Sequence, residues 1–222
     1  MKIFQLLTEN QALEITHKIN ESKFVEGISS ARGLAKNVKN NYELDISDEV
    51  AKSITNNLYN ILINCQWLRN HYLPRIFSLP IINKYKIGST YGRHIDSSYL
   101  KHGMQFIRGD LSYTLMLSRS NDYVGGDLII ENNSVKTKVK LEIGQIIVYP
   151  SMLWHQVEPI VGGERIACIG WIESAIKNEE ARELLSLWED FALNHEKLDL
   201  SEDDLLMMSH FKNKLQSMLS KT

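Results

Sequence analysis

The spacing of apolar positions divides the chain into three stretches. From Thr8 onward apolar residues recur every three to four positions, and Gln11 follows Thr8 at capping-box spacing, so a helix is expected there. The same spacing over 47–65, with two acidic residues in the first turn, predicts a second helix that begins at Ser47. The polar stretch 32–41 between the two helices is interpreted as a solvated loop.

The middle of the chain follows a two-residue alternation instead. All but two of the 12 glycines fall between Gly88 and Gly170, which indicates many turns between short strands. Strands are expected over 110–118, 127–131, 135–141, 146–150 and 165–173. In the first of these strands, an apolar face alternates with the more polar face of Ser112 and Thr114, which is suited to lining a cavity.

Helical spacing returns after Ser174. One expected helix carries an apolar stripe of Leu184, Leu187, Trp188 and Phe191. A second, with Ser201 and Asp204 at its start, carries Leu205, Met208, Phe211, Leu215 and Met218. Both stripes are expected to face the core, although they would also suit a homo-oligomer interface. The pattern as a whole predicts one α+β domain over 1–222, with a helical part (1–75), a β-sandwich or barrel core (76–175) and C-terminal helices packed outside (176–222).

Composition and charge exclude several classes of protein. The 222 residues carry 25 Lys+Arg and 27 Asp+Glu, so there is no excess of positive charge for nucleic acid or an anionic membrane. The stretch 143–157 is uncharged but too short to span a bilayer, and the N-terminus lacks the pattern of a secretion signal. Two cysteines cannot form a disulfide framework. We therefore expect a soluble cytoplasmic protein.

Among the seven histidines, His94 differs from the others because Asp96 stands two residues away. On an extended segment these two side chains point to the same face, so an imidazole and a carboxylate converge. A surface hydrogen bond would explain this pair on its own. The remaining histidines need no special role: His17, His195 and His210 fall on expected helices, and His71 and His102 fall in expected loops.

A second pair of residues strengthens the case for a metal site. His155 follows the strand that ends at Pro150, and Arg165 begins the strand 165–173. Two histidines and one carboxylate are the ligand set of non-haem Fe(II) oxygenases, which leaves metal positions open for a 2-oxo acid and dioxygen. An arginine matches the distal carboxylate of such an acid in a bidentate manner.

Five spaced motifs together resemble the PKHD-type hydroxylases, which are prolyl/lysyl-hydroxylase-like Fe(II)/2-oxoglutarate-dependent dioxygenases. In chain order the motifs are Tyr85-x-x-Gly88-x-x-Tyr91-x-x-His94-x-Asp96, Arg108-x-Asp110-Leu-Ser, Tyr123-x-Gly-Gly-Asp-Leu, Tyr149-Pro-Ser-x-x-x-His155-x-Val157-x-Pro159 and Gly163-x-Arg165. The resemblance implies a double-stranded β-helix, or jelly roll, with iron bound by His94, Asp96 and His155.

The resemblance also assigns the cosubstrate. It implies that Arg165 binds 2-oxoglutarate, that Tyr85, Thr114 and Trp171 line the same pocket, and that L-ascorbate re-reduces oxidised iron. Arg93 and Trp154, which directly precede the two ligand histidines, depart from the family pattern and put the shape of the substrate in doubt. The segment 97–107 is expected to form part of the substrate entrance.

The expected reaction is hydroxylation of an unactivated C–H bond with release of succinate and carbon dioxide. Its substrate is either a peptidyl proline or lysine or a small molecule such as a free amino acid, another metabolite or an iron chelator. Two alternatives stay open at this point. The same ligands would suit a zinc-dependent hydrolase, and the same fold could serve as a non-catalytic carboxylate-binding module. Oxygen- and 2-oxoglutarate-dependent release of succinate would distinguish the dioxygenase from both.

Overall fold

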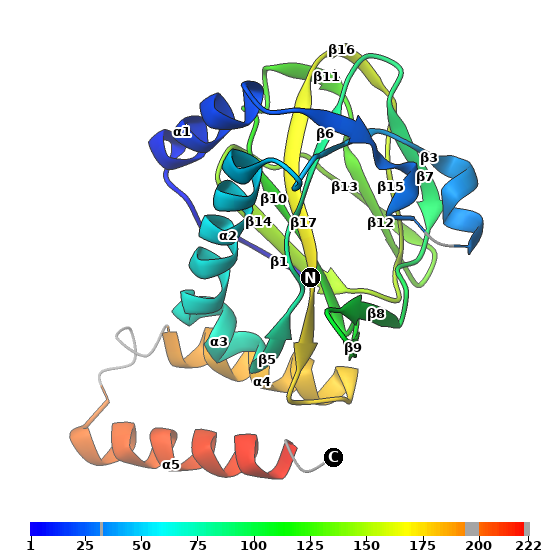
Figure 1. Cartoon of the computed structure of the whole chain (residues 1–222). Coiled ribbons are helices and arrows are strands. Elements are labelled where there is room, and N and C mark those ends of the chain that lie inside the picture. The colour runs from blue at the N-terminus through cyan, green and yellow to red at the C-terminus, as the bar shows by residue number, and fades with distance from the viewer. Residues whose placement is uncertain (32, 194–199, 220–222) are drawn as a thin grey trace.

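The computed structural model describes residues 1–31, 33–193 and 200–219. Within this part of the chain, two antiparallel sheets face each other (Figure 1), and two short two-stranded sheets, β8–β9 and β11–β16, complete the β core. The larger sheet has the order β1-β14-β10-β17-β6-β4-β2, with β5 pairing to β17, and the smaller has the order β13-β12-β15-β7-β3.

The strands of the larger sheet come from parts of the chain that are far apart in sequence, between residues 2 and 174. They are β1 (Lys2–Gln5), β2 (Phe24–Glu26), β4 (Tyr42–Leu44), β5 (Pro74–Phe77), β6 (Ile81–Tyr85), β10 (Leu111–Met116), β14 (Gln145–Pro150) and β17 (Arg165–Ser174). The smaller sheet contains β3 (Lys39–Asn40), β7 (Thr90–His94), β12 (Leu128–Asn132), β13 (Val135–Val139) and β15 (Trp154–Val157). The short sheets pair β8 (Tyr99–His102) with β9 (Gln105–Arg108) and β11 (Tyr123–Gly125) with β16 (Ile160–Gly163).

The two faces of the larger sheet have different partners. Helices α1 (Glu9–Asn20) and α2 (Glu49–Asn64) cover its outer face (Figure 1), where Leu115 and Cys168 belong to the main apolar core. The inner face, with Thr114 and Arg165, looks toward the smaller sheet across a pocket. The alternation predicted for the strands 110–118 and 165–173 is therefore confirmed, and it places their polar residues inside the β core.

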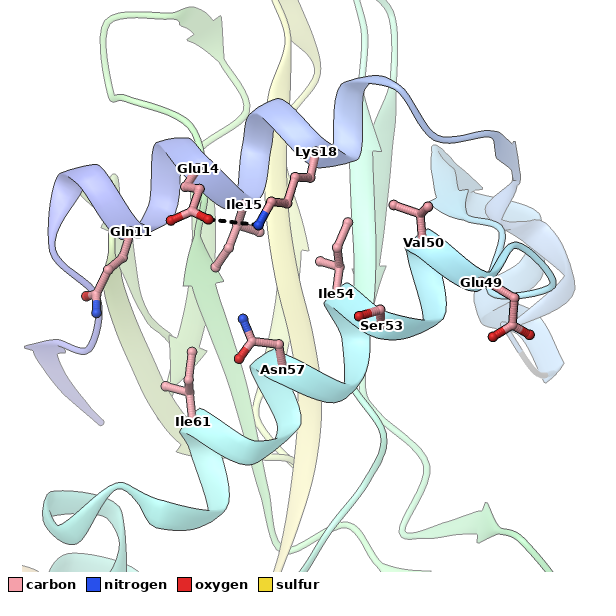
Figure 2. Close-up of a pocket in the computed structure, with 10 residues that line it drawn as sticks. All are labelled: Gln11, Glu14, Ile15, Lys18, Glu49, Val50, Ser53, Ile54, Asn57 and Ile61. Carbon is pink, nitrogen blue, oxygen red and sulfur yellow. Dashed lines mark hydrogen bonds and ion pairs between the residues drawn. The ribbon is translucent and has the colours of Figure 1, made fainter.

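The N-terminal helices begin where side chains can cap them. Thr8 and Gln11 form the predicted capping box of α1. The second helix begins at Glu49 rather than at Ser47, because the Asp48 carboxylate accepts a hydrogen bond from the backbone N–H of Ala51 and so acts as the N-cap. A groove of about 770 Å³ lies between α1 and α2, where the Glu14–Lys18 ion pair (2.7 Å) lies at its edge (Figure 2).

Two loop assignments made from the sequence are wrong. His71 lies on helix α3 (Gln66–Tyr72), fully buried, where its ring stacks on Trp67 and its Nε2 is 3.2 Å from Asp190. His102 lies on strand β8. The polar stretch 32–41 is also not a simple solvated loop. It contains a 3₁₀ helix, η2 (Gly33–Val38), and strand β3, and its Lys39 is buried.

The prediction that the C-terminal apolar stripes face the core is wrong. On α4 (Glu179–Leu193) the side chains of Leu184, Leu187 and Phe191 are 51%, 57% and 50% exposed. The buried face of this helix carries Arg182, Leu185, Ser186 and Glu189 instead, because polar partners satisfy its charges. Arg182 donates to two backbone carbonyls, and Glu189 pairs with Lys212 at 2.8 Å.

Helix α5 (Glu202–Leu219) lies outside α4, away from both sheets (Figure 1). Its Phe211 ring meets Trp188 of α4 at 4.8 Å between centroids, and none of its described residues is buried. In the described part of the chain, no helix is long and apolar enough to cross a lipid bilayer.

Candidate active site

A pocket of about 660 Å³ lies between the two sheets and receives side chains from both. The smaller sheet supplies His94 and His155, and the larger sheet supplies Arg165 and Trp171. All seven residues singled out by the sequence analysis for iron and cosubstrate line this pocket: Tyr85, His94, Asp96, Thr114, His155, Arg165 and Trp171. The groove between α1 and α2 contains none of them.

Strand pairing brings the two histidines together from distant parts of the chain. His94 ends β7, and it stands directly opposite His155 of β15 in the antiparallel register. Asp96, two residues past the end of β7, lies 3.6 Å from His155 Nε2 and 4.0 Å from His94 Nε2. One ligand atom from each residue lies within 4.8 Å of the other two. Atoms bound about 2.1 Å from one metal ion lie about 3–4 Å apart, so this donor set fits a single transition-metal ion.

The chain fixes which nitrogen of each imidazole faces the metal position. The Nδ1 of His94 is 2.7 Å from the carbonyl oxygen of Gly92, and the Nδ1 of His155 is 2.9 Å from that of Leu153. A carbonyl oxygen only accepts hydrogen bonds, so each Nδ1 carries the proton and donates it. Each Nε2 is then left with a lone pair that points toward Asp96, which is the arrangement that a histidine ligand needs.

The Asp96 carboxylate accepts a hydrogen bond from a hydroxyl group that sequence reasoning did not identify as part of the site. Ser112 Oγ on β10 donates to Asp96 Oδ2 at 2.5 Å and lies 2.8 Å from Ser151 Oγ. Asp96 follows a strand of the smaller sheet and β10 belongs to the larger sheet, so this hydrogen bond links the two sheets across the pocket. The position of Ser112 on the predicted polar face of its strand was the signal that could have found it.

Burial favours the neutral form of the His94 imidazole. Desolvation is the main reason that the pKa of His94 falls from 6.5 to about 4, and the neighbouring His155 lowers it further. The hydrogen bond to Gly92 and the charge of Asp96 act in the opposite direction. His94 is therefore neutral near pH 7, as metal binding requires.

Arg165 is a buried cation without an acidic partner. Arg165 is only 2% exposed, so it does not form an ion pair on the protein surface. Among the described residues, no carboxylate forms an ion pair with its guanidinium. Its guanidinium carbon lies 5.3 Å from the ring centroid of Tyr85, its register partner on β6, and its Nε has no hydrogen-bond partner. Burying an unpaired cation is costly, so the arrangement fits an anionic ligand.

The absence of a side chain at Gly126 leaves space for the Arg165 side chain. Gly126 has a φ of +66°, and a Cβ added there would lie 2.2 Å from Ile160 Cδ1 and 3.2 Å from Arg165 Cδ. Only glycine meets both the backbone conformation and the packing requirement at this position.

The remaining three predicted pocket residues lie on the inner face of the larger sheet. Tyr85 is buried, which raises the pKa of its hydroxyl to about 12, so the phenol stays protonated. Thr114 is buried between its register partners Ile147 and Ile169. The indole N–H of Trp171 is buried without a hydrogen-bond partner.

The two departures from the family pattern, Arg93 and Trp154, contact each other but do not line the pocket. Each directly precedes an inward-facing histidine on its strand, so both side chains lie on the outer face of the smaller sheet. The Arg93 guanidinium lies 3.9 Å from the ring centroid of Trp154, and its Nε donates to Glu131 at 3.1 Å. The hairpin β8–β9, within the predicted entrance segment 97–107, adds Leu100 and Lys101 to the pocket lining.

Comparisons with known proteins agree with this geometry. Residues 80–173 match the family described as the 2OG-Fe(II) oxygenase superfamily. A PKHD-type hydroxylase from Prochlorococcus marinus (strain MIT 9211) is 37% identical over 185 residues, which cover 82% of each chain. One from Synechococcus sp. (strain CC9902) is 38% identical over 183 residues, which cover 82% of this chain and 81% of the relative.

Solved structures share the fold at lower sequence identity. A Pseudomonas putida prolyl-4-hydroxylase is 18% identical, with a TM-score of 0.52 over 78% of this chain and 91% of its own. A prolyl hydroxylase from Trichoplax adhaerens, solved with a hypoxia inducible factor peptide fragment, is 17% identical, with a TM-score of 0.55 over 83% of this chain and 86% of its own. These likenesses confirm the jelly-roll core with helices outside.

The hydrolase and the non-catalytic binding module are set aside by this family membership. The required cofactor and cosubstrate are Fe(II) and 2-oxoglutarate, and the donor set and the buried arginine of this chain fit both. The chain belongs to the PKHD-type hydroxylases of the 2OG-Fe(II) oxygenase superfamily and is a 2-oxoglutarate-dependent dioxygenase.

Proposed function

We propose that His94, Asp96 and His155 bind Fe(II) and that Arg165 binds the distal carboxylate of 2-oxoglutarate. The observation that carries this proposal is the meeting of three ligand atoms within 4.8 Å in the pocket that also contains an unpaired, buried arginine. We assign Tyr85, Thr114 and Trp171 to the wall of the same cosubstrate site.

The bound iron and 2-oxoglutarate, with dioxygen, supply the chemistry that yields succinate and carbon dioxide and hydroxylates a C–H bond. The chain contributes orientation and desolvation. The carbonyls of Gly92 and Leu153 keep the two Nε2 atoms directed inward, and the Ser112 hydroxyl steadies the Asp96 carboxylate. Two charge-assisted hydrogen bonds from the guanidinium of Arg165 would hold the cosubstrate at its far end, which sets the distance of its other end from the iron ligands.

Among the substrates considered, we favour a peptidyl substrate, with the side chain of a proline or lysine entering the pocket. Two large exposed side chains, Tyr99 and Phe106, lie on the hairpin β8–β9, whose Leu100 and Lys101 line the pocket. Exposed aromatic side chains beside a pocket suit a molecule that extends beyond it. A small metabolite or a free amino acid would leave these two side chains without a contact.

The test is 2-oxoglutarate turnover in the purified, Fe(II)-loaded protein. We expect peptide substrates to accelerate succinate release in the presence of oxygen, and L-ascorbate to sustain it. Asp96→Ala should abolish turnover, and Zn(II) in place of Fe(II) should not support it. Acceleration by free amino acids or iron chelators, and not by peptides, would refute the peptidyl assignment while leaving the iron site intact.

We further propose that the chain acts as a single dioxygenase domain in the cytoplasm and pairs with a second copy through its C-terminal helices. The exposed apolar residues of α4 and α5 support the pairing. Helix α5 has an acidic first turn, Glu202 to Asp204, and carries Lys214 further on, so two antiparallel copies would bring opposite charges together. Sedimentation analysis of wild type and Phe211→Glu would test it. A monomeric wild type refutes the pairing.

A further inference from the structure

The segment before β4 packs directly against the strand that carries His94. Strand β3 pairs with β7 so that Lys39 stands opposite Tyr91. Just before β3, Val38 approaches the backbone of Gly92 so closely that an added Cβ would lie 2.8 Å from Val38 Cβ. This part of the stretch 32–41 is therefore built into the wall of the metal site.

Lys39 has a fixed position in this wall. Its ammonium donates to Glu43 Oε1 at 2.5 Å and to Ser30 Oγ at 2.6 Å, and Ser30 Oγ donates to the same carboxylate oxygen at 2.5 Å. The side chains of Lys39 and Glu43 are only 3% and 10% exposed. Glu43 belongs to β4 of the larger sheet, so the ion pair ties the two sheets together beside the pocket.

The ring of Tyr91 lies next to both Lys39 and the proposed iron ligand. The Lys39 ammonium is 5.2 Å from the centroid of this ring, within the range of a cation–π contact. On β7, the same ring stacks on the His94 imidazole with 3.6 Å between centroids and 17° between planes. The hydrogen bond from Nδ1 to Gly92 fixes one edge of the imidazole, and the stacked ring restricts the tilt that this bond leaves free.

We propose that Tyr91 is a positioning residue for the iron ligand His94, and that the buried Lys39–Glu43 pair holds Tyr91 in turn. The proposal rests on the assignment of His94 as a ligand. Partners that orient a histidine ligand typically change metal affinity by about 10- to 100-fold when they are removed. The aromatic ring is the part that matters here, because the stacking uses the ring face and not the hydroxyl group.

The test compares metal binding in the metal-free wild-type protein and five variants. Co(II) is titrated anaerobically, and the visible absorption of the bound ion reports its ligand geometry. Tyr91→Leu should weaken binding about 10-fold and change the spectrum, whereas Tyr91→Phe should stay within about twofold of wild type. The double variant Lys39→Met/Glu43→Gln removes both buried charges together, and it should weaken binding by several-fold with a smaller change in the spectrum.

Tyr42→Leu is the matched control. Lys86 lies over the Tyr42 ring at the same 5.2 Å, but Tyr42 does not line the pocket, so this change should leave Co(II) affinity and spectrum unaltered. Wild-type affinity and spectrum in Tyr91→Leu would overturn the proposal, as would equal losses in Tyr91→Leu and Tyr91→Phe. If Tyr91→Leu does not fold, the double variant decides, and unaltered binding there refutes the role of Lys39. Unaltered binding in His94→Ala would instead refute the ligand assignment itself.

Discussion

Replacing Ser112 with alanine removes one oxygen atom from the proposed iron site without changing a proposed ligand. In the wild type, Ser112 Oγ donates to Asp96 Oδ2 at 2.5 Å, and both side chains are largely shielded from water. A hydrogen bond to a charged group contributes about 1.5–3 kcal/mol. At about 1.4 kcal/mol per tenfold, Ser112→Ala should raise the dissociation constant for Fe(II) by about 10- to 100-fold.

The assay is anaerobic calorimetric titration of the metal-free protein with Fe(II), with chemical denaturation measured in parallel. Ser118→Ala is the matched control, since Ser118 is a buried serine just beyond the same strand whose hydroxyl accepts from the backbone N–H of Ile166 at 2.7 Å. It should lower the free energy of unfolding by about 1–3 kcal/mol and leave Fe(II) affinity unchanged. Fe(II) binding within twofold of wild type in Ser112→Ala would refute the reasoning.

Three further outcomes are expected. Arg165→Met should bind Fe(II) normally but raise the dissociation constant for 2-oxoglutarate at least 100-fold, because two charge-assisted hydrogen bonds are lost. The control Arg119→Met removes an exposed partner of Glu9 and should bind 2-oxoglutarate normally. Equilibrium titration of both variants with 2-oxoglutarate checks these outcomes. Gly126→Ala should also weaken 2-oxoglutarate binding, because the added methyl group displaces Arg165; a wild-type dissociation constant would contradict this. The metal-free protein should lose about 2 kcal/mol of its free energy of unfolding between pH 7 and pH 5. The reason is that the pKa of His94 is about 6.5 in the unfolded chain and about 4 in the folded chain, so that only the unfolded chain takes up the proton in this range. Chemical denaturation of His94→Gln at the two pH values should show a correspondingly smaller loss.

Local patterns predicted much of the fold because they depend on neighbours in the chain. The capping box of Thr8 and Gln11 needs only three residues of separation, and it is present. The alternation along β17 correctly separated the face of Arg165 from the face of Cys168, since side chains of a strand alternate whatever the strand packs against. The pair of His94 and Asp96 could be recognised in the same way.

Patterns failed where the identity of the partner decides which face is buried. The spacing of Leu184, Leu187 and Phe191 correctly predicted a helix, but its buried face carries Arg182 and Glu189, whose charges find partners outside this helix. The spacing of apolar residues shows that a segment is helical, but it does not show which element the helix packs against. A paired charge in the interior therefore looks like a surface residue in the sequence.

The sequence by itself determined many of the element types, the candidate ligand residues and the strand face that carries the arginine. Only the tertiary structure brought His155 opposite His94, gave Asp96 its serine partner, and buried Lys39 against Glu43 beside Tyr91. The two histidines meet on neighbouring strands of the smaller sheet, whereas the Asp96–Ser112 and Lys39–Glu43 contacts join the two sheets. Their formation depends on sheet order and register, which are set by the packing of the whole core and cannot be read from the spacing of residues along any one strand.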